Sequence, residues 1–92
     1  MTREDLLISY CVTNQYKQVL RLITECGINP NYKDGLAGIT CAAYGSYTTY
    51  LVLCKYKYDH KKWGYGVKAL AKNLKHKKFL KMINKWEEEG KL

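Results

Sequence analysis

Several residue types are scarce in this chain of 92 residues: it has one proline, two arginines and one phenylalanine. No apolar run approaches the roughly 18–20 residues that a membrane-spanning helix requires, and the charged start at residues 1–5 lacks the pattern of a secretory leader. The four cysteines form no Cys-x-x-Cys pair and no close cluster with histidine, which argues against the usual zinc sites. We therefore expect a cytoplasmic protein with no membrane span, no metal and no cofactor, whose cysteines act as small core residues.

Patterns that would indicate catalysis are also missing. Ser9 and Ser46 have no accompanying histidine and aspartate pattern, and the Gly-Tyr-Gly sequence at 64–66 lacks the further glycines and the preceding strand of a phosphate-binding loop. His60 and His76 lie far apart in lysine-rich surroundings, so we expect both to be solvated. The sequence therefore predicts that the protein is not an enzyme.

Apolar residues and lysines dominate what is present. The chain is 47% apolar, which is enough for one small folded domain over residues 1–92. Residues 1–54 contain four basic and four acidic side chains, whereas residues 55–92 contain twelve lysines and only four acidic side chains. The second segment therefore carries the whole net charge of +8, which favours an acidic partner.

The spacing of apolar residues predicts an all-α fold of six short helices in three hairpins. Thr2 and Asp5 have the spacing of a capping box at the first helix, and Asn14 is a candidate cap for the second. Residues 32–35 are predicted to form a turn, and residues 64–66 are predicted to form the loop that opens the third unit. The three units are expected at about 2–31, 32–59 and 60–90.

The clearest family signal lies at residues 20–31, where an apolar helical ending runs into a glycine and then Asn-Pro-Asn. The residues that give this signal are Leu20, Leu22, Ile23, Gly27, Pro30 and Asn31. This segment resembles the junction between the second helix and the loop of an ankyrin repeat, whose pattern reads Val-x-Leu-Leu-Leu-x-x-Gly-Ala-Asp-Pro-Asn. Pairs of small residues begin at 11, 42 and 71, close to the family's period of about 33 residues. The resemblance implies an ankyrin-like solenoid, although the family's Thr-Pro-Leu-His motif is absent from all three units.

Six lysines of the third unit recur at helical spacing and form two stripes. They are Lys68, Lys72 and Lys75 on its first helix, and Lys78, Lys81 and Lys85 on its second. Such stripes either give the end of the stack a polar face that suits solvent or an acidic protein, or they contact nucleic-acid phosphates. Lysine outnumbers arginine by fourteen to two, which suits loose phosphate contact better than reading of base edges.

Aromatic residues gather near the two predicted loops between units. The candidate partner contacts are Tyr32, Lys33, Tyr56, Tyr58, Trp63 and Tyr65. The ankyrin resemblance implies partner contacts at the loop tips and on the surface of the first helices, and tyrosine and tryptophan are effective interface anchors. If the protein instead binds nucleic acid, the aromatic residues near the second loop would stack on bases. These are Tyr56, Tyr58, Trp63 and Tyr65.

The sequence thus predicts a small binding module, an inhibitor or adaptor that docks onto another protein with an acidic surface. The alternative is an RNA- or DNA-binding protein that uses the lysine stripes. A composition rich in lysine and tyrosine and poor in proline and arginine is what AT-rich coding gives, and it is consistent with a phage or viral accessory protein in the host cytoplasm. Three units with sparse consensus have marginal stability, which leaves self-association across an exposed end of the stack open.

Overall fold

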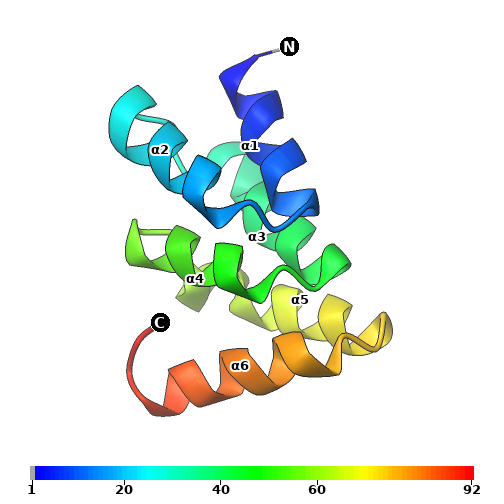
Figure 1. Ribbon diagram of the computed structural model, residues 1–92. Helices are drawn as coiled ribbons and strands as arrows, with labels where there is room; N and C mark the ends of the chain where they lie inside the picture. Colours follow the sequence, from blue (N-terminus) through cyan, green and yellow to red (C-terminus); the bar gives the residue numbers. More distant parts are fainter. Residues whose placement is uncertain (1) are drawn as a thin grey trace.

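The computed structural model describes residues 2–92 and contains, over that range, six α-helices and no strand (Figure 1). The helices are α1 (Arg3–Val12), α2 (Tyr16–Cys26), α3 (Tyr32–Tyr44), α4 (Tyr47–Lys55), α5 (His60–Asn73) and α6 (Lys77–Glu88). This confirms the all-α fold predicted from apolar spacing. No helix in the described part of the chain is long and apolar enough to cross a membrane.

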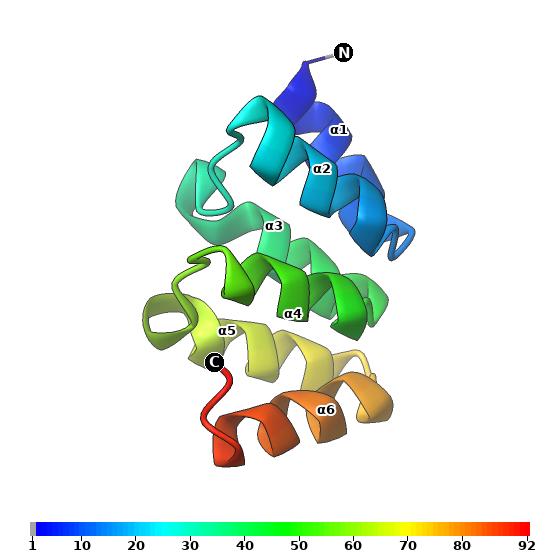
Figure 2. The same ribbon diagram turned by 60° about the vertical axis from the view of Figure 1, so that its left-hand side comes forward.

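Consecutive helices pair as hairpins, and the hairpins stack on one another (Figure 2). Helices α1, α3 and α5 contact each other in that order and form one row, while α2, α4 and α6 form a second row beside it. We call the pairs α1–α2, α3–α4 and α5–α6 units 1, 2 and 3. The chain is therefore a stack of three helical hairpins, as the sequence predicts.

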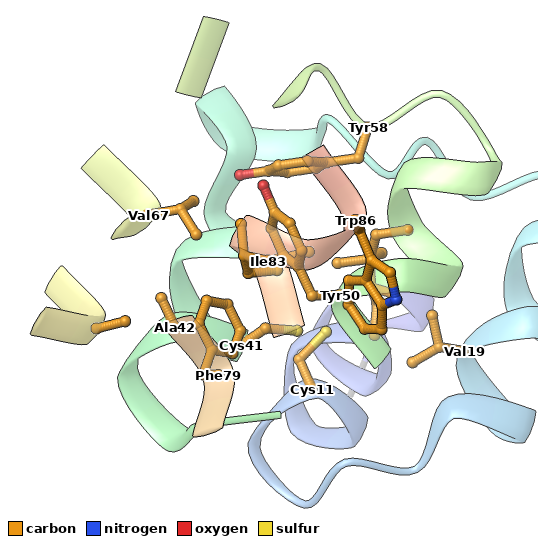
Figure 3. Packing of buried hydrophobic residues seen from close by; sticks show 14 of the residues in the cluster. Cys11, Val19, Cys41, Ala42, Tyr50, Tyr58, Val67, Phe79, Ile83 and Trp86 are labelled. Carbon is orange, nitrogen blue, oxygen red and sulfur yellow. The ribbon is translucent and has the colours of Figure 1, made fainter. Parts of the chain in front are cut away.

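The apolar core follows the stack between the two rows (Figure 3). Its fully buried side chains include Leu7, Cys11, Val19, Cys41, Tyr50, Leu53, Val67, Phe79 and Ile83. Burial raises the pKa of the Cys41 thiol, and it raises the pKa of Cys54 to about 12, so both remain protonated core groups. The prediction that every cysteine lies in the core is wrong for Cys26, which is exposed at the end of α2.

The capping box predicted at the first helix is present. The Thr2 hydroxyl accepts from the Asp5 backbone N–H at 3.1 Å, and the Asp5 carboxylate accepts from the Thr2 N–H at 3.2 Å. These bonds hold the pKa of Asp5 below its usual value. At the second helix the prediction is wrong, because Gln15 takes the capping position and Asn14 adopts a positive φ of 56°. The Asn14 side chain instead reaches into unit 2.

Residues 32–35 form the predicted turn. Lys33, Asp34 and Gly35 all have positive φ, so the right-handed part of α3 begins only after Gly35. The loop predicted at residues 64–66 is wrong, because both glycines lie inside α5. The His60 ring packs against Gly64 inside this helix, and a Cβ at that position would lie 2.8 Å from the imidazole.

Candidate interaction surface

Two of the predicted partner contacts belong to the packing between units 2 and 3. Tyr58 is only 4% exposed, and its hydroxyl donates to the Gly35 carbonyl at 2.8 Å. Burial accordingly raises the pKa of Tyr58. The partly buried ring of Trp63 packs against Tyr58 with ring centroids 5.5 Å apart, and it also covers Gly35. Tyr58 is therefore not available to a partner, and Trp63 presents only part of its surface.

Three others lie at the connections between units. Lys33 is exposed and places its ammonium 5.6 Å from the centroid of the Tyr32 ring, while Tyr56 is 39% exposed at the end of α4. The connections are joined to each other by Asn31, which donates to the Lys57 carbonyl and accepts from the backbone N–H that follows Tyr58, both at 2.8 Å. These residues form a fixed edge of the stack rather than a flexible tip.

The sixth, Tyr65, is 86% exposed and follows Trp63 by two residues on α5, so it lies on the opposite side of the helix from Trp63, which packs toward unit 2. We define the terminal face as Lys61, Tyr65, Lys68, Ala69 and Lys72 of α5 with Leu80 and Asn84 of α6. These residues line two adjoining hollows of about 430 and 260 Å³ that share Tyr65 and Lys68, and His60, Gly64 and Glu87 complete the lining of the smaller one. The terminal face therefore combines an exposed aromatic ring, three lysines and a partly apolar floor.

The structure separates the two predicted lysine stripes. Lys68 and Lys72 lie on the terminal face, but Lys75 follows the end of α5 in a turn with a φ of 62°, so it is not part of a helical stripe. Lys78 points back toward unit 2, with its ammonium 5.8 Å from the centroid of the Tyr47 ring. Lys81 and Lys85 are exposed on α6 but do not line the terminal face. The six lysines therefore do not make one continuous surface.

Hydrogen bonds link four polar side chains, three of which line the smaller hollow together with Tyr65. The Tyr50 hydroxyl lies 2.6 Å from Nδ1 of His60, and Nε2 of His60 lies 2.7 Å from the Glu87 carboxylate. Because a carboxylate only accepts, the Nε2–H donates to Glu87, and in the neutral ring Nδ1 accepts from Tyr50. The Lys68 ammonium completes the chain at 2.9 Å from Glu87.

The prediction that His60 is solvated is therefore wrong, since the His60 side chain is only 9% exposed. Partial burial raises the pKa of Glu87, but hydrogen bonds from His60 and Lys68 and the charge of Lys68 outweigh it, so the pKa is lower than usual. Glu87 therefore neutralises Lys68 and leaves Lys61 and Lys72 as the unpaired lysines of the terminal face within the described chain.

His76 is likewise not simply solvated. Its Nε2–H donates to the Ala43 carbonyl at 2.8 Å, which ties the start of α6 to the end of α3. In residues 2–92, no group of three or more histidine, cysteine, aspartate or glutamate side chains is arranged to hold a metal ion. Both histidines therefore serve as contacts between elements.

Comparison with protein-family models, with curated proteins and with solved structures found no match to this chain. The function is therefore inferred from the surface of the protein itself, above all from the terminal face. Sequence reasoning missed Lys61, Ala69, Leu80 and Asn84 of that surface. The signal for Lys61 was present, because Lys61, Tyr65, Lys68 and Lys72 recur at helical spacing once α5 is extended back to His60.

Proposed function

We propose that this chain is a binding module rather than an enzyme, and that its terminal face docks onto another protein with an acidic surface. The observation that carries the proposal is Tyr65, an exposed aromatic ring set between Lys61 and Lys72. Aromatic side chains are common anchors of protein interfaces, and surrounding lysines speed the encounter with an acidic partner. An inhibitor or adaptor role follows, because docking alone would block or bridge the partner.

We also propose an ankyrin-like relationship for the stack. Its support is the arrangement of first and second helices in two rows, together with the glycine at the end of α2, which has a φ of 67°. A left-handed glycine after the second helix fits the Gly-x-x-Pro-Asn junction of the resemblance.

A pair of matched charge reversals tests the docking proposal. In Lys61→Glu/Lys72→Glu the terminal face loses its two unpaired lysines, whereas Lys81→Glu/Lys85→Glu changes the net charge equally on the exposed side of α6. We expect the first double variant to weaken partner capture by about tenfold or more and the second to leave it nearly unchanged. Capture from a lysate of the source organism, followed by mass spectrometry, provides the measurement. Equal losses in both variants would contradict the use of the terminal face.

The alternative function is nucleic-acid binding, favoured by the row of exposed lysines on α6 at 77, 78, 81 and 85. In that case the affinity for oligonucleotides should fall linearly with the logarithm of salt concentration, with a slope set by the phosphates contacted. The absorbance ratio at 260 and 280 nm of the purified protein, before and after a high-salt wash, is the first observation to make. Co-purifying nucleic acid that salt removes would favour this alternative.

A further inference from the structure

The turns between the helices of each hairpin fix which residues are equivalent in the three units. Asn14, Gly45 and Lys75 all have positive φ, and they lie 31 and 30 residues apart. The residue after each donates its backbone N–H to the carbonyl five residues earlier, at 2.8–2.9 Å. Counting back from these turns therefore aligns α1, α3 and α5 residue by residue.

In units 1 and 2, one set of equivalent positions on the first helix contacts the next unit of the stack. Leu7 and Cys11 of α1 are fully buried, and Figure 3 shows the sulfur of Cys11 directed at Cys41 of α3. The equivalent residues of α3 are Gly38 and Ala42, which are also buried. Gly38 is covered by Tyr58, whose ring a Cβ on Gly38 would meet at 2.1 Å. These positions therefore form the contact that each unit makes with the next unit along the chain.

In unit 3 the equivalent positions lie on the terminal face. Lys68 and Lys72 occupy the positions of Gly38 and Ala42. Tyr65 occupies the position of Gly35, a residue of unit 2 that Trp63 of unit 3 covers. On the second helix, half-buried Leu80 is equivalent to the fully buried Tyr50 and Val19. The terminal face therefore has the position of a stacking surface but carries long cationic side chains in place of small residues.

We infer that the terminal face receives an acidic amphipathic α-helix of a partner protein, laid along α5 as the next layer of the stack. This inference rests on the proposed function and specifies its partner. Small residues let helices approach closely, whereas Tyr65 and the lysines hold a neighbour farther away, so the contact is made by side-chain ends. Lys61 and Lys72 are eleven residues apart, about 16 Å along the helix. Carboxylates at i and i+11 on the partner helix match them, and an apolar residue between them covers Tyr65 and Leu80.

A second copy of this chain is a poorer occupant. In unit 1, Tyr10 of α1 lines a hollow with Arg21 and Glu25 of α2, and the carboxylate of Glu25 is already paired with Arg21 at 3.5 Å. Residues 1–31, which include unit 1, contain three basic and three acidic side chains, so this end of the stack has no net negative charge to attract the lysines of the terminal face. Charge complementarity therefore points to a different, acidic protein.

Two labelled peptides of identical composition test this inference. One is a helical peptide of about 18 residues, long enough to span α5, with glutamates at i, i+4, i+7 and i+11 and leucines on the same edge. The other has the same residues in scrambled order. By fluorescence anisotropy at about 150 mM salt, we expect the striped peptide to bind at least about tenfold more tightly. Lys61→Glu/Lys72→Glu and Tyr65→Ala should each remove this preference, while Lys81→Glu/Lys85→Glu should keep it.

The remaining outcomes separate this inference from the proposed function. Equal binding of the two peptides, still lost in Lys61→Glu/Lys72→Glu, would overturn the helical partner but keep an acidic one. Binding of an oligothymidine with no binding of either peptide would overturn both. A dimer in size-exclusion chromatography with light scattering, lost in Tyr65→Ala, would assign the terminal face to a second copy and overturn the inference.

Discussion

At the scale of single residues, Gly38 controls how closely the α4–α5 connection approaches α3. A Cβ at this position would lie 2.1 Å from the Tyr58 ring, which is held in place because its hydroxyl donates to Gly35. We therefore expect Gly38→Ala to lower the free energy of unfolding by about 3 kcal/mol, at the upper end of the usual cost of overpacking. Urea denaturation followed by circular dichroism measures this loss.

Gly66 provides the matched control for that substitution. It also lies in a helix interior, but a Cβ there would meet no atom within 4 Å. Gly66→Ala should therefore raise the free energy of unfolding by about 0.5–1 kcal/mol, because alanine loses less backbone entropy in a helix than glycine does. A Gly38→Ala variant as stable as Gly66→Ala would show that Tyr58 moves aside more easily than the packing indicates.

At the scale of secondary-structure elements, the Glu87 carboxylate joins α6 to α5 through His60 and Lys68. Because its pKa is lowered in the folded state, the stability that it contributes is present above the ordinary glutamate pKa of 4.5 and is lost as the pH falls below that value. The groups that face it are His60, Lys68 and, through His60, the Tyr50 hydroxyl. A pH series of urea denaturation therefore tests this junction.

Glu87→Gln should be less stable than the natural chain by about 1 kcal/mol at pH 7, near the low end for a charged hydrogen bond because the side chain is about one-third exposed. The difference between the two proteins should shrink as the pH is lowered from about 5 to 3. Glu88→Gln is the control, since Glu88 is exposed and forms no ion pair within residues 2–92. A difference that stays constant with pH would contradict the role of the Glu87 charge.

The helices could be predicted from the sequence because their signals are local. Apolar spacing predicts the helical segments, and the glycines after α2 and α3 end those two helices with the positive φ that such positions require. The start of α5 could not be predicted, because Gly64 suggests a loop by local sequence, whereas the structure places it inside the helix with the His60 ring packed against it. His60 in turn is positioned by Tyr50 and by Glu87, 27 residues away.

The candidate site was predictable only in part, for the same reason. Tyr58 and Tyr65 lie in one lysine-rich segment and cannot be distinguished by composition. Their opposite burial depends on Gly35 and Gly38, which leave room for Tyr58 on one side of α5, and on the lack of a following unit beside Tyr65 within the described residues. Local sequence therefore located the basic aromatic region but not the face that presents it.

At the scale of the whole molecule, each boundary between units is crossed by specific hydrogen bonds as well as by apolar packing. Between units 1 and 2, the Asn14 side chain accepts from the Thr49 backbone N–H at 3.1 Å and from its hydroxyl at 2.8 Å. Between units 2 and 3, His76 donates to the Ala43 carbonyl at 2.8 Å. In a stack where each unit contacts only its neighbours, such bonds decide whether the units unfold together.

The two tryptophans make this cooperativity measurable, because Trp63 and Trp86 both lie in unit 3 while Asn14 acts at the other boundary. Asn14→Gly suits the positive φ but leaves the buried Thr49 groups without their acceptor, so we expect a loss of about 1–3 kcal/mol. Lys75→Gly, the equivalent change at an exposed turn, should instead stabilise slightly, because the strain of lysine at a φ of 62° exceeds the extra backbone entropy that glycine loses on folding. If the stack unfolds as one body, tryptophan fluorescence and circular dichroism will shift together in Asn14→Gly. A fluorescence midpoint that stays in place while the circular dichroism midpoint falls would mean that unit 1 unfolds alone.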